Sequence, residues 1–331
     1  MSRVAVIGAG AWGTALSIVL ARGGRHHVRL WAYEREVCQS IQTRRTNDLF
    51  LPGFAIPESV EVSNLLPAAL EECRFVVAVM PSHHARALYS MMRAFLAPKT
   101  TIVSATKGIE QDSYKRMTEV AAEASGVTRV AALSGPSFAK EVARGDPTAL
   151  TIACTDPEVA ALLQREFSDP MFRVYTNDDV IGVELGGALK NVIAIAAGIA
   201  EGLGFGHNTA AALITRGLAE ITRLAVACGA RRETLAGLSG MGDLVLTCTG
   251  GLSRNRTVGV ELGRGRKLPE IMAGMHGMVA EGVLTTDAAL GLARKHGVEM
   301  PISEQMHEIL HTHKSPKDAI RDLMSRPGKD E

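Results

Sequence analysis

A single lysine stands in an otherwise apolar stretch near the middle of the chain. Lys190 is the only charged residue between Leu185 and Ala200. A buried ammonium group is costly unless it is paired, neutralised or directed at a ligand. Two interpretations follow. Either the stem of the lysine lies on apolar surface while its amine reaches water, or the amine does chemistry in a site.

The helical neighbours of this lysine are small. Residues at i−4, i−3, i+4 and i+7 share one face of a helix with residue i. Around Lys190 these positions hold Gly186, Gly187, Ala194 and Ala197. We therefore expect room beside the amine for another chain or a small molecule.

A glycine-rich turn near the N-terminus predicts a dinucleotide site. The strand-like run 4–7 is followed by Gly-Ala-Gly-Ala-Trp-Gly at 8–13 and then by an apolar helical pattern over 14–21. This is G-x-G-x-x-G in its strand–turn–helix context. The first glycine permits the tight turn, the second lets a pyrophosphate approach the backbone, and the third lets the helix pack closely. The helix N-terminus adds free N–H groups and a positive dipole end.

The end of the next expected strand bears on cofactor choice. NAD proteins usually place an acid there to bind the adenosine ribose. Here Trp31, Ala32 and Tyr33 come first, and Glu34 and Arg35 follow. Because the acid is late and an arginine is adjacent, both NAD(H) and NADP(H) stay open. Arg35 is then either a cofactor contact or an exposed loop residue.

Further apolar segments predict a parallel sheet covered on both faces. The expected strands are 28–31, 75–80, 101–104, 129–133, 148–153 and 172–175. Ligands of such sheets bind beyond the carboxyl ends of the strands. Lys107 and the turn Gly135-Pro136-Ser137 follow two of these ends. Lys107 is thus a candidate partner for an anion, with a solvated loop lysine as the alternative.

Helical patterns replace strand patterns near residue 178. The expected helices are 180–200, 208–228, 255–263, 280–296, 302–310 and 316–325. They predict two domains, a dinucleotide-binding domain over 1–178 and a helical substrate-binding domain over 179–331. Such a boundary would put Lys190 close to a cleft between domains, where ligands often bind.

A second polar candidate lies in the helical half. Ser253-Arg254-Asn255 follows two glycines and precedes an expected helix. Backbone N–H groups and a guanidinium would together hold a dianion such as a phosphate. The alternative is a capped helix start with exposed arginines. Asp243, after Gly-Met-Gly, is either another helix cap or the partner of a lysine.

Composition limits the classes of function. The 331 residues are 46% hydrophobic and 21% charged, and the net charge is +1. These values fit a globular protein of about two domains, with no global field that favours nucleic acid or an anionic membrane. The five cysteines form no Cys-x-x-Cys or zinc-ligand spacing, so a disulfide frame or structural zinc is not expected.

Two further features are expected to be ordinary. His307 and His311 share a helix face, but without a nearby acid or third ligand they predict a solvated helix end rather than a metal site. The apolar run around Lys190 lies between Glu184 and Glu201 and looks too short and too charged to span a membrane. No signal segment is recognised at the N-terminus, so we expect a cytoplasmic location.

These motifs occur in one order along nearly the whole chain, and the chain resembles bacterial NAD(P)-dependent sn-glycerol-3-phosphate dehydrogenases. The most specific parts are 187–191, Gly-Ala-Leu-Lys-Asn, and the Ser-Arg-Asn turn at 253–255. The resemblance implies a Rossmann-like doubly wound α/β sheet, followed by an all-helical domain of the 6-phosphogluconate dehydrogenase C-terminal type. It also implies interconversion of dihydroxyacetone phosphate and sn-glycerol 3-phosphate, which supplies glycerophospholipid synthesis.

Together the motifs and the resemblance predict the site. Lys190 is the expected proton donor and acceptor, and Thr247 is expected to line the site. The expected substrate contacts are Lys107, Gly135, Ser137, Lys190, Asp243, Ser253, Arg254 and Asn255. The expected cofactor contacts are Gly8, Gly10, Ala11, Trp12, Gly13, Tyr33, Arg35, Lys107, Ala139, Arg254, Val279 and Glu281. Ala11 replaces a serine often seen in the family.

The sequence allows more than one outcome for the properties below. We expect burial and nearby Lys107 to lower the pKa of Lys190 and Asp243 to oppose that shift. The oligomeric state is not fixed, and a homodimer is one arrangement that the resemblance allows. Two other functions compete with the first: a related dehydrogenase of a 3-hydroxyacid or sugar acid, and a dinucleotide-binding regulator without catalysis.

Overall fold

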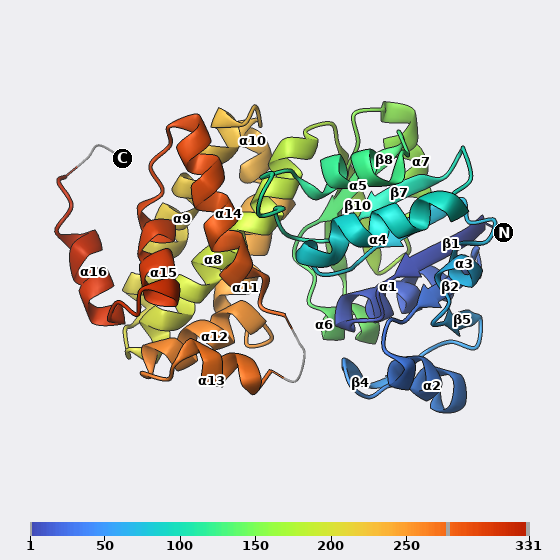
Figure 1. Ribbon diagram of the computed structural model, residues 1–331, viewed down its shortest axis with the longest axis horizontal. Coiled ribbons are helices and arrows are strands. Elements are labelled where there is room, and N and C mark those ends of the chain that lie inside the picture. Colours follow the sequence, from blue (N-terminus) through green and yellow to red (C-terminus); the bar gives the residue numbers. More distant parts are fainter. Residues whose placement is uncertain (1, 276–278, 329–331) are drawn as a thin grey trace.

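The N-terminal half of the chain folds around one twisted sheet. The computed structural model describes residues 2–275 and 279–328, and Figure 1 shows a sheet-containing half joined to a helical half. Among the described residues the main sheet has eight strands in the order β10-β9-β8-β7-β6-β1-β2-β5. Its strands are β1 (Ser2–Ile7), β2 (His26–Trp31), β5 (Val60–Ser63), β6 (Phe75–Ala78), β7 (Thr101–Ser104), β8 (Val130–Ser134), β9 (Thr148–Ala153) and β10 (Phe172–Asn177).

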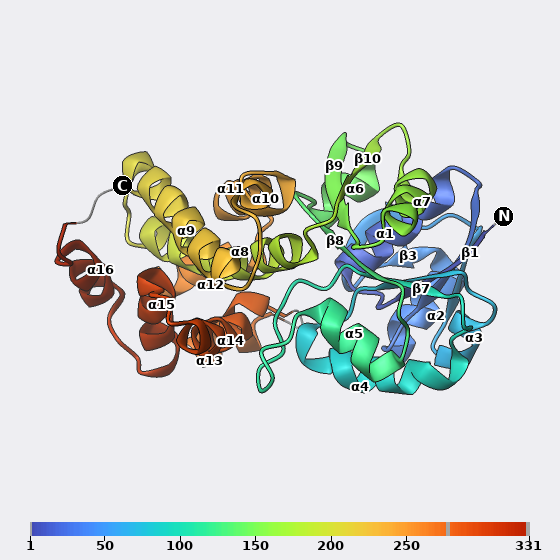
Figure 2. The same cartoon turned by 90° about the horizontal axis from the view of Figure 1, so that it is seen from above.

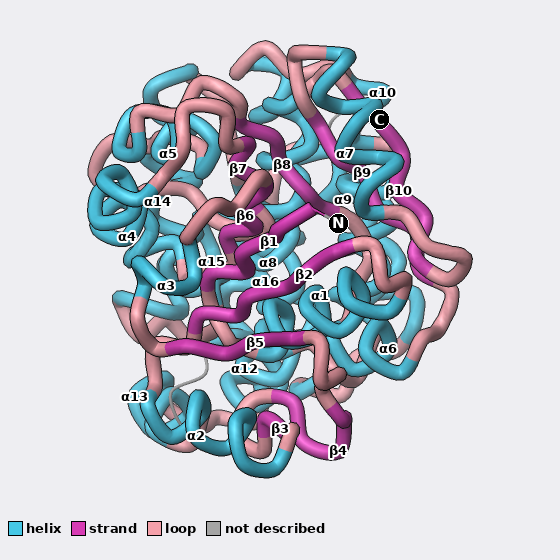
Figure 3. The backbone as a smooth tube through the Cα atoms, turned by 90° about the vertical axis from the view of Figure 1, so that its right-hand side faces the viewer, coloured by secondary structure: helices cyan, strands magenta, loops and turns pink. Residues whose placement is uncertain are grey.

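Helices cover both faces of this sheet, as Figure 3 shows. They are α1 (Ala11–Arg22), α2 (Arg35–Arg44), α3 (Leu66–Leu70), α4 (Ala85–Met92), α5 (Met117–Ser125), α6 (Ala139–Arg144) and α7 (Pro157–Phe167). Val4 and Val6 of β1 join the apolar cluster that contains α1. The alternate residues Ala5 and Ile7 join the cluster that contains α4. Burial on both faces explains why the strands read as nearly continuous apolar runs.

The predicted doubly wound parallel sheet is confirmed, with one strand pair that departs from the parallel arrangement. β9 pairs antiparallel with β8, whereas the other neighbouring strands of the main sheet pair in parallel. Parallel neighbours need a long crossover. The link from β8 to β9 contains only the short helix α6 and returns the chain at the end where β8 stopped. The edge strand β5 and the antiparallel pair β3 (Thr46–Asn47) and β4 (Leu51–Ala55) were not predicted.

The C-terminal half is helical and built around one long helix. α8 (Val180–Gly202) leaves the sheet half and runs through the middle of the helical half (Figure 2). Asp179 caps it, because its carboxylate accepts a 2.8 Å hydrogen bond from the N–H of Gly182. The helices around it are α9 (His207–Ala227), α10 (Arg232–Leu235), α11 (Asp243–Thr249), α12 (Arg254–Gly263), α13 (Leu268–Ala273), α14 (Glu281–His296), α15 (Pro301–His311) and α16 (Pro316–Met324).

Small residues let α8 and α12 pack with their backbones close together. A Cβ on Gly198 would stand 2.1 Å from the carbonyl oxygen of Arg256, and one on Gly259 would stand 2.1 Å from that of Ile195. No side chain larger than hydrogen fits either position without moving a backbone. α8 is thereby fixed along its length, and so is the lysine that it carries.

The apolar composition of α8 comes from this burial. Among the described residues it is the one single helix that is long and apolar enough to cross a membrane, at 23 residues and a mean hydropathy of 1.6. The sequence argument that this run is too short to span was therefore wrong. Of its most apolar 18-residue window, 83% is buried inside the protein. A helix buried on all sides is apolar all round without any contact with lipid.

Candidate active site

Lys190 is buried where the two halves of the molecule meet. Lys190 is only 5% exposed. The interpretation that its stem lies on apolar surface while its amine reaches water is therefore wrong. The ammonium donates hydrogen bonds to the Asp243 carboxylate and, at 2.8 Å, to the Thr247 hydroxyl. Thr247 lies one turn after Asp243 on α11, so both partners come from one short helix.

Asp243 also joins this amine to a second lysine from the sheet domain. Lys107 follows β7, and its ammonium lies 2.7 Å from Asp243 Oδ2 and 3.0 Å from the carbonyl oxygen of Gly135. One buried carboxylate therefore binds two lysines, one from each domain. Gly242, not Asp243, stands at the cap position of α11, so the interpretation of Asp243 as a helix cap is wrong and that of a lysine partner is confirmed.

This arrangement brings the pKa of Lys190 close to neutrality. Burial disfavours the charged amine and lowers its pKa from 10.5 to about 7. The Asp243 carboxylate opposes the shift, and the positive charge of Lys107 adds to it. The directions expected from the sequence are confirmed. An amine with a pKa near 7 can both donate and accept a proton at ordinary pH.

Gly186 and Gly187 beside Lys190 serve packing against other segments of this chain. A Cβ on Gly187 would stand 2.4 Å from Ser134 Oγ, and one on Gly186 would stand 2.6 Å from the carbonyl oxygen of Ser239. That space is filled by the end of β8 and by the π-helical turn Leu238–Gly242. The sequence could not show which backbone occupies that face.

The glycine turn has the geometry that a dinucleotide needs. Gly8 adopts φ +117, and its ideal Cβ would stand 2.7 Å from the carbonyl oxygen of Val79. A Cβ on Gly13 would stand 1.8 Å from the carbonyl oxygen of Gly8, which permits α1 to pack closely on the turn. Gly10, in contrast, has nothing within 4 Å of its Cβ position, so its backbone is open to a ligand at the start of α1.

A buried donor beside this turn supports the same conclusion. The indole N–H of Trp12 is buried and finds no hydrogen-bond partner among the residues that the structure describes. Buried N–H groups in proteins are normally paired. Together with the open backbone at Gly10, this donor shows that the residues present fit a dinucleotide.

Two predicted cofactor contacts lie on the surface beyond β2. Tyr33 is 77% exposed, and its ring makes an edge contact with that of Trp31. Arg35 is exposed at the first position of α2. Ala139, another predicted cofactor contact, is the first residue of α6, which follows β8 at the same carboxyl edge of the sheet.

The start of α14 brings Glu281 from the helical domain to the sheet domain. Its carboxylate accepts hydrogen bonds from the backbone N–H of Ser82, at 2.9 Å, and from the Ser82 hydroxyl, at 2.6 Å. Burial raises the pKa of Glu281, and these two bonds oppose the shift. Val279 is half-buried just before this helix. Sequence reasoning missed Ser82, which lies four residues after the end of β6 at Ala78 and could have been considered because it is near a carboxyl end of the sheet.

The Ser-Arg-Asn turn forms a capped helix start with an exposed arginine, and its role as a phosphate site stays a prediction. Ser253 caps α12 by accepting a 3.2 Å hydrogen bond from the N–H of Arg256. Asn255 is used internally, because its amide donates to Asn191 Oδ1 at 3.0 Å and accepts from the N–H of Gly282 at 2.9 Å. Arg254 is different: it is exposed, and within residues 2–275 and 279–328 its guanidinium makes no hydrogen bond or ion pair.

The turn after β8 approaches the same junction. Gly135 adopts φ +138, and its carbonyl oxygen accepts from Lys107 and, at 3.0 Å, from the Ser137 hydroxyl. Ser134 was missed by sequence reasoning. Its hydroxyl is buried beside Gly187 and has no hydrogen-bond partner in the described part of the chain. Its position at the end of a strand could have identified it as a candidate site residue.

A second polar link across the junction was also missed. Glu184 of α8 accepts hydrogen bonds from the backbone N–H of Thr118, at 2.8 Å, from the Thr118 hydroxyl and from Arg116, at 2.6 Å. Burial raises the pKa of Glu184, while Arg116 and Thr118 oppose that shift. The link ties α8 to the start of α5, six residues before Lys190 along the helix.

Comparisons with known proteins agree with this arrangement. Residues 3–160 match a family model described as the N-terminus of NAD-dependent glycerol-3-phosphate dehydrogenase, and residues 179–321 match the model of its C-terminus. A relative from Koribacter versatilis, named glycerol-3-phosphate dehydrogenase [NAD(P)+], is 67% identical and covers 100% of this chain and 99% of its own. A relative of the same name from Acidobacterium capsulatum is 56% identical over 100% of both chains.

A solved structure shows the same fold. The crystal structure of glycerol-3-phosphate dehydrogenase from Coxiella burnetii superposes with a TM-score of 0.94 at 43% identity, covering 98% of this chain and 99% of its own. The fold and the site therefore define a two-domain, nicotinamide-dependent oxidoreductase. Within that class the chain belongs to the NAD(P)-dependent glycerol-3-phosphate dehydrogenase family. The resemblance drawn from the motifs is confirmed, and neither alternative function is supported by these relatives.

Proposed function

We propose that this chain interconverts dihydroxyacetone phosphate and sn-glycerol 3-phosphate, with Lys190 as the general acid and base. Family membership supports the reaction. The observation that carries the role of Lys190 is its environment: a buried amine, paired with Asp243 and Thr247, that adjoins Lys107 of the other domain.

The chemistry follows from what the site residues can do. When bound, the nicotinamide cofactor exchanges a hydride with the carbon that carries the carbonyl or hydroxyl group. Protonated Lys190 hydrogen-bonds the carbonyl oxygen and donates its proton as negative charge develops there. In the reverse direction the neutral amine accepts the hydroxyl proton. Asp243 and Thr247 hold the amine in one position in both directions.

The substrate phosphate needs a cation that is not already used. Arg254 meets this requirement, because it is exposed at the start of α12 without a hydrogen-bonding partner in the described structure. We propose that it binds the phosphate with the free N–H groups of that helix, which Ser253 begins. The remaining proposed substrate contacts are Lys107, Gly135, Ser137, Asp243 and Asn255. Asn255 acts mainly by holding α12 against α8 and α14.

The proposed cofactor contacts divide by position. Gly8, Gly10, Ala11, Trp12 and Gly13 form the turn for the pyrophosphate. Tyr33 and Arg35 stand exposed where the adenosine half would extend, so the adenosine ribose meets an arginine rather than an acid alone. Lys107, Ala139, Arg254, Val279 and Glu281 complete the set near the domain junction. NAD(H) and NADP(H) are both accommodated by this arrangement.

One assay tests the proposal. Purified, folded protein is supplied with dihydroxyacetone phosphate and either NADH or NADPH, and initial rates of cofactor oxidation are measured together with product stereochemistry. We expect sn-glycerol 3-phosphate to form, and the two values of kcat/KM to rank the cofactors. If neither cofactor is oxidised, the proposal fails. Equal rates with a non-phosphorylated ketone would mean that no phosphate site operates.

We also propose a wider setting for this activity. The product is the backbone of glycerophospholipids, which supports a role in supplying their synthesis in the cytoplasm.

We propose a division between the domains at 178/179, because β10 ends at Asn177 and α8 begins at Val180. A homodimer is also proposed, as an arrangement that the family resemblance allows. Analytical ultracentrifugation tests the dimer, and a single monomeric species would exclude it.

A further inference from the structure

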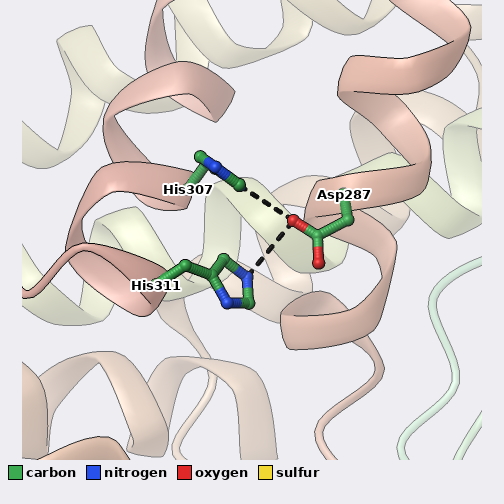
Figure 4. A group of neighbouring side chains, drawn as sticks. All are labelled: Asp287, His307 and His311. Atoms are coloured by element: carbon green, nitrogen blue, oxygen red, sulfur yellow. Dashed lines mark hydrogen bonds and ion pairs between the residues drawn. The ribbon is translucent and has the colours of Figure 1, made fainter.

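Three potential metal ligands converge between two helices, away from the proposed active site. His307 and His311 lie one turn apart on α15, and Asp287 lies on the neighbouring helix α14 (Figure 4). His307 Nδ1 is 2.8 Å and His311 Nε2 is 3.2 Å from the same atom, Asp287 Oδ1. The sequence expectation that no acid accompanies this histidine pair was wrong, because Asp287 is 20 residues upstream and reaches the pair only through helix packing.

We propose that Asp287, His307 and His311 bind a zinc-like divalent transition-metal ion that joins α14 to α15. The three donor atoms all lie within 4.8 Å of one another. Imidazole nitrogen and carboxylate oxygen are ligands of zinc at about 2.0–2.2 Å, which places neighbouring donors about 3.3 Å apart in a tetrahedron. The separations of 2.8 and 3.2 Å between Asp287 Oδ1 and the two imidazole nitrogens are close to that spacing.

The kind of donor selects the kind of ion. Two imidazoles and one carboxylate suit zinc and its borderline neighbours, whereas magnesium and calcium prefer sets made of oxygen atoms. Three protein ligands leave a fourth tetrahedral position for water. The side chains are 36%, 36% and 41% exposed, so an ion has direct access from solvent.

The two helices that carry the ligands are already anchored at their other ends. α14 begins with Glu281 at the domain junction. The start of α15 is bound by the buried Glu220 carboxylate, which accepts hydrogen bonds from the N–H groups of Ile302, at 2.8 Å, and Ser303, at 2.9 Å. The ligand positions are therefore preorganised, and an ion there would stabilise the helical domain by binding the folded chain.

Titration of the full chain with zinc tests this inference. Chelator-treated protein is titrated with zinc chloride by calorimetry, and cobalt(II) is added separately to record its visible absorption. We expect one zinc per chain at this site, a rise in melting temperature with zinc, and cobalt bands typical of four-coordinate nitrogen and oxygen ligation. Loss of a group that only hydrogen-bonds a metal ligand costs about 10- to 100-fold in metal affinity. Each of His307→Ala, His311→Ala and Asp287→Asn should therefore weaken zinc binding by at least about tenfold.

A matched control separates this site from other surface histidines. His296 is exposed at the end of α14, so His296→Ala should leave zinc affinity and the cobalt spectrum unchanged. Asp287→Asn keeps the side-chain shape, and circular dichroism confirms that each variant is folded. Absence of zinc binding by the native chain would overturn the inference, as would equal binding by the His307→Ala/His311→Ala double variant. Turnover measured without metal keeps this outcome separate from that of the dehydrogenase proposal.

Discussion

The glycine turn and the lysine centre reach their chemistry by opposite routes. The turn uses six consecutive residues, and its binding groups belong to the backbone at the start of α1. The lysine centre uses side chains from three separate segments: Asp243 lies 53 residues from Lys190 and 136 residues from Lys107. A local backbone motif can be recognised from sequence alone, whereas a long-range centre depends on how the domains pack.

Substitutions in these two regions should have different effects. The turn positions a ligand, so changes there should alter binding and folding. The lysine centre handles a proton, so changes there should alter turnover while binding survives.

Replacement of the central amine should have the largest effect. In Lys190→Met, kcat for reduction of dihydroxyacetone phosphate should fall by about 10²–10⁴-fold, because proton donation to the carbonyl oxygen is lost. Cofactor affinity, followed by quenching of tryptophan fluorescence, should be almost unchanged. A variant that keeps more than about a tenth of native turnover would show that another group donates the proton.

Loss of the carboxylate that binds both lysines should have the next largest effect on turnover. In Asp243→Asn, kcat should fall by about 10–100-fold, since the amine keeps its place but loses a charged partner. Steady-state kinetics with saturating cofactor measures the change. Thr247→Val, which removes only the neutral hydroxyl bound at 2.8 Å, serves as the milder companion. Equal effects of the two substitutions would contradict a special role for the carboxylate.

Loss of the unpaired guanidinium should act on the substrate rather than on the proton. Arg254→Ala should raise KM for dihydroxyacetone phosphate by about 30- to 150-fold, or about 2–3 kcal/mol, because a charge-assisted contact is lost. Arg256 is the matched control, as it is already paired with Glu201 at 2.5 Å. Arg256→Ala should leave KM within about threefold of the native value. An unchanged KM in Arg254→Ala would place the phosphate elsewhere.

Two glycines of the turn should separate binding from folding. Gly10→Ala adds a methyl where nothing lies within 4 Å, so the melting temperature should hold while KM for the cofactor rises. Gly13→Ala places a methyl group 1.8 Å from the carbonyl oxygen of Gly8. This substitution should therefore destabilise the fold by about 1–3 kcal/mol. Thermal melts and cofactor titrations measure both. If Gly10→Ala left cofactor affinity unchanged, the pyrophosphate would not approach that backbone.

Much of the fold could be predicted because its signals are local. The run 148–153 forms a strand with those bounds, and the turn at 8–13 connects β1 to α1 as its glycines require. Helix starts at Val180 and Arg254 agree with the sequence patterns within one residue. Strand direction was not predictable in the same way, since the antiparallel pairing of β8 and β9 depends on the path of a loop.

The site was predicted less completely, for the same physical reason. Lys190 and Lys107 could be selected as charges in unusual places, but the sequence did not show that Asp243 binds both. Gly186 and Gly187 looked like room for a ligand, whereas they let α8 contact neighbouring backbone and Ser134. Asp287 could not be connected to His307, because their contact exists only after α14 and α15 pack.

The pH dependence of kcat/KM in both directions reports whether Lys190 donates and accepts the proton. Because burial lowers the pKa of Lys190 to about 7, reduction requires the protonated form and should decline as pH rises through about 7. Oxidation requires the neutral form and should decline as pH falls through the same value. The substrate phosphate has a second pKa of about 6, so its titration adds a separate change to the kcat/KM profile at lower pH.

Asp243→Asn completes the measurement. Asp243 raises the pKa of Lys190 against the effect of burial, so its loss should move both limbs to lower pH. The account predicts opposed limbs near pH 7 in the native chain that move together in this variant. Profiles that are flat between about pH 6 and 9, or limbs that stay in place in Asp243→Asn, would contradict it.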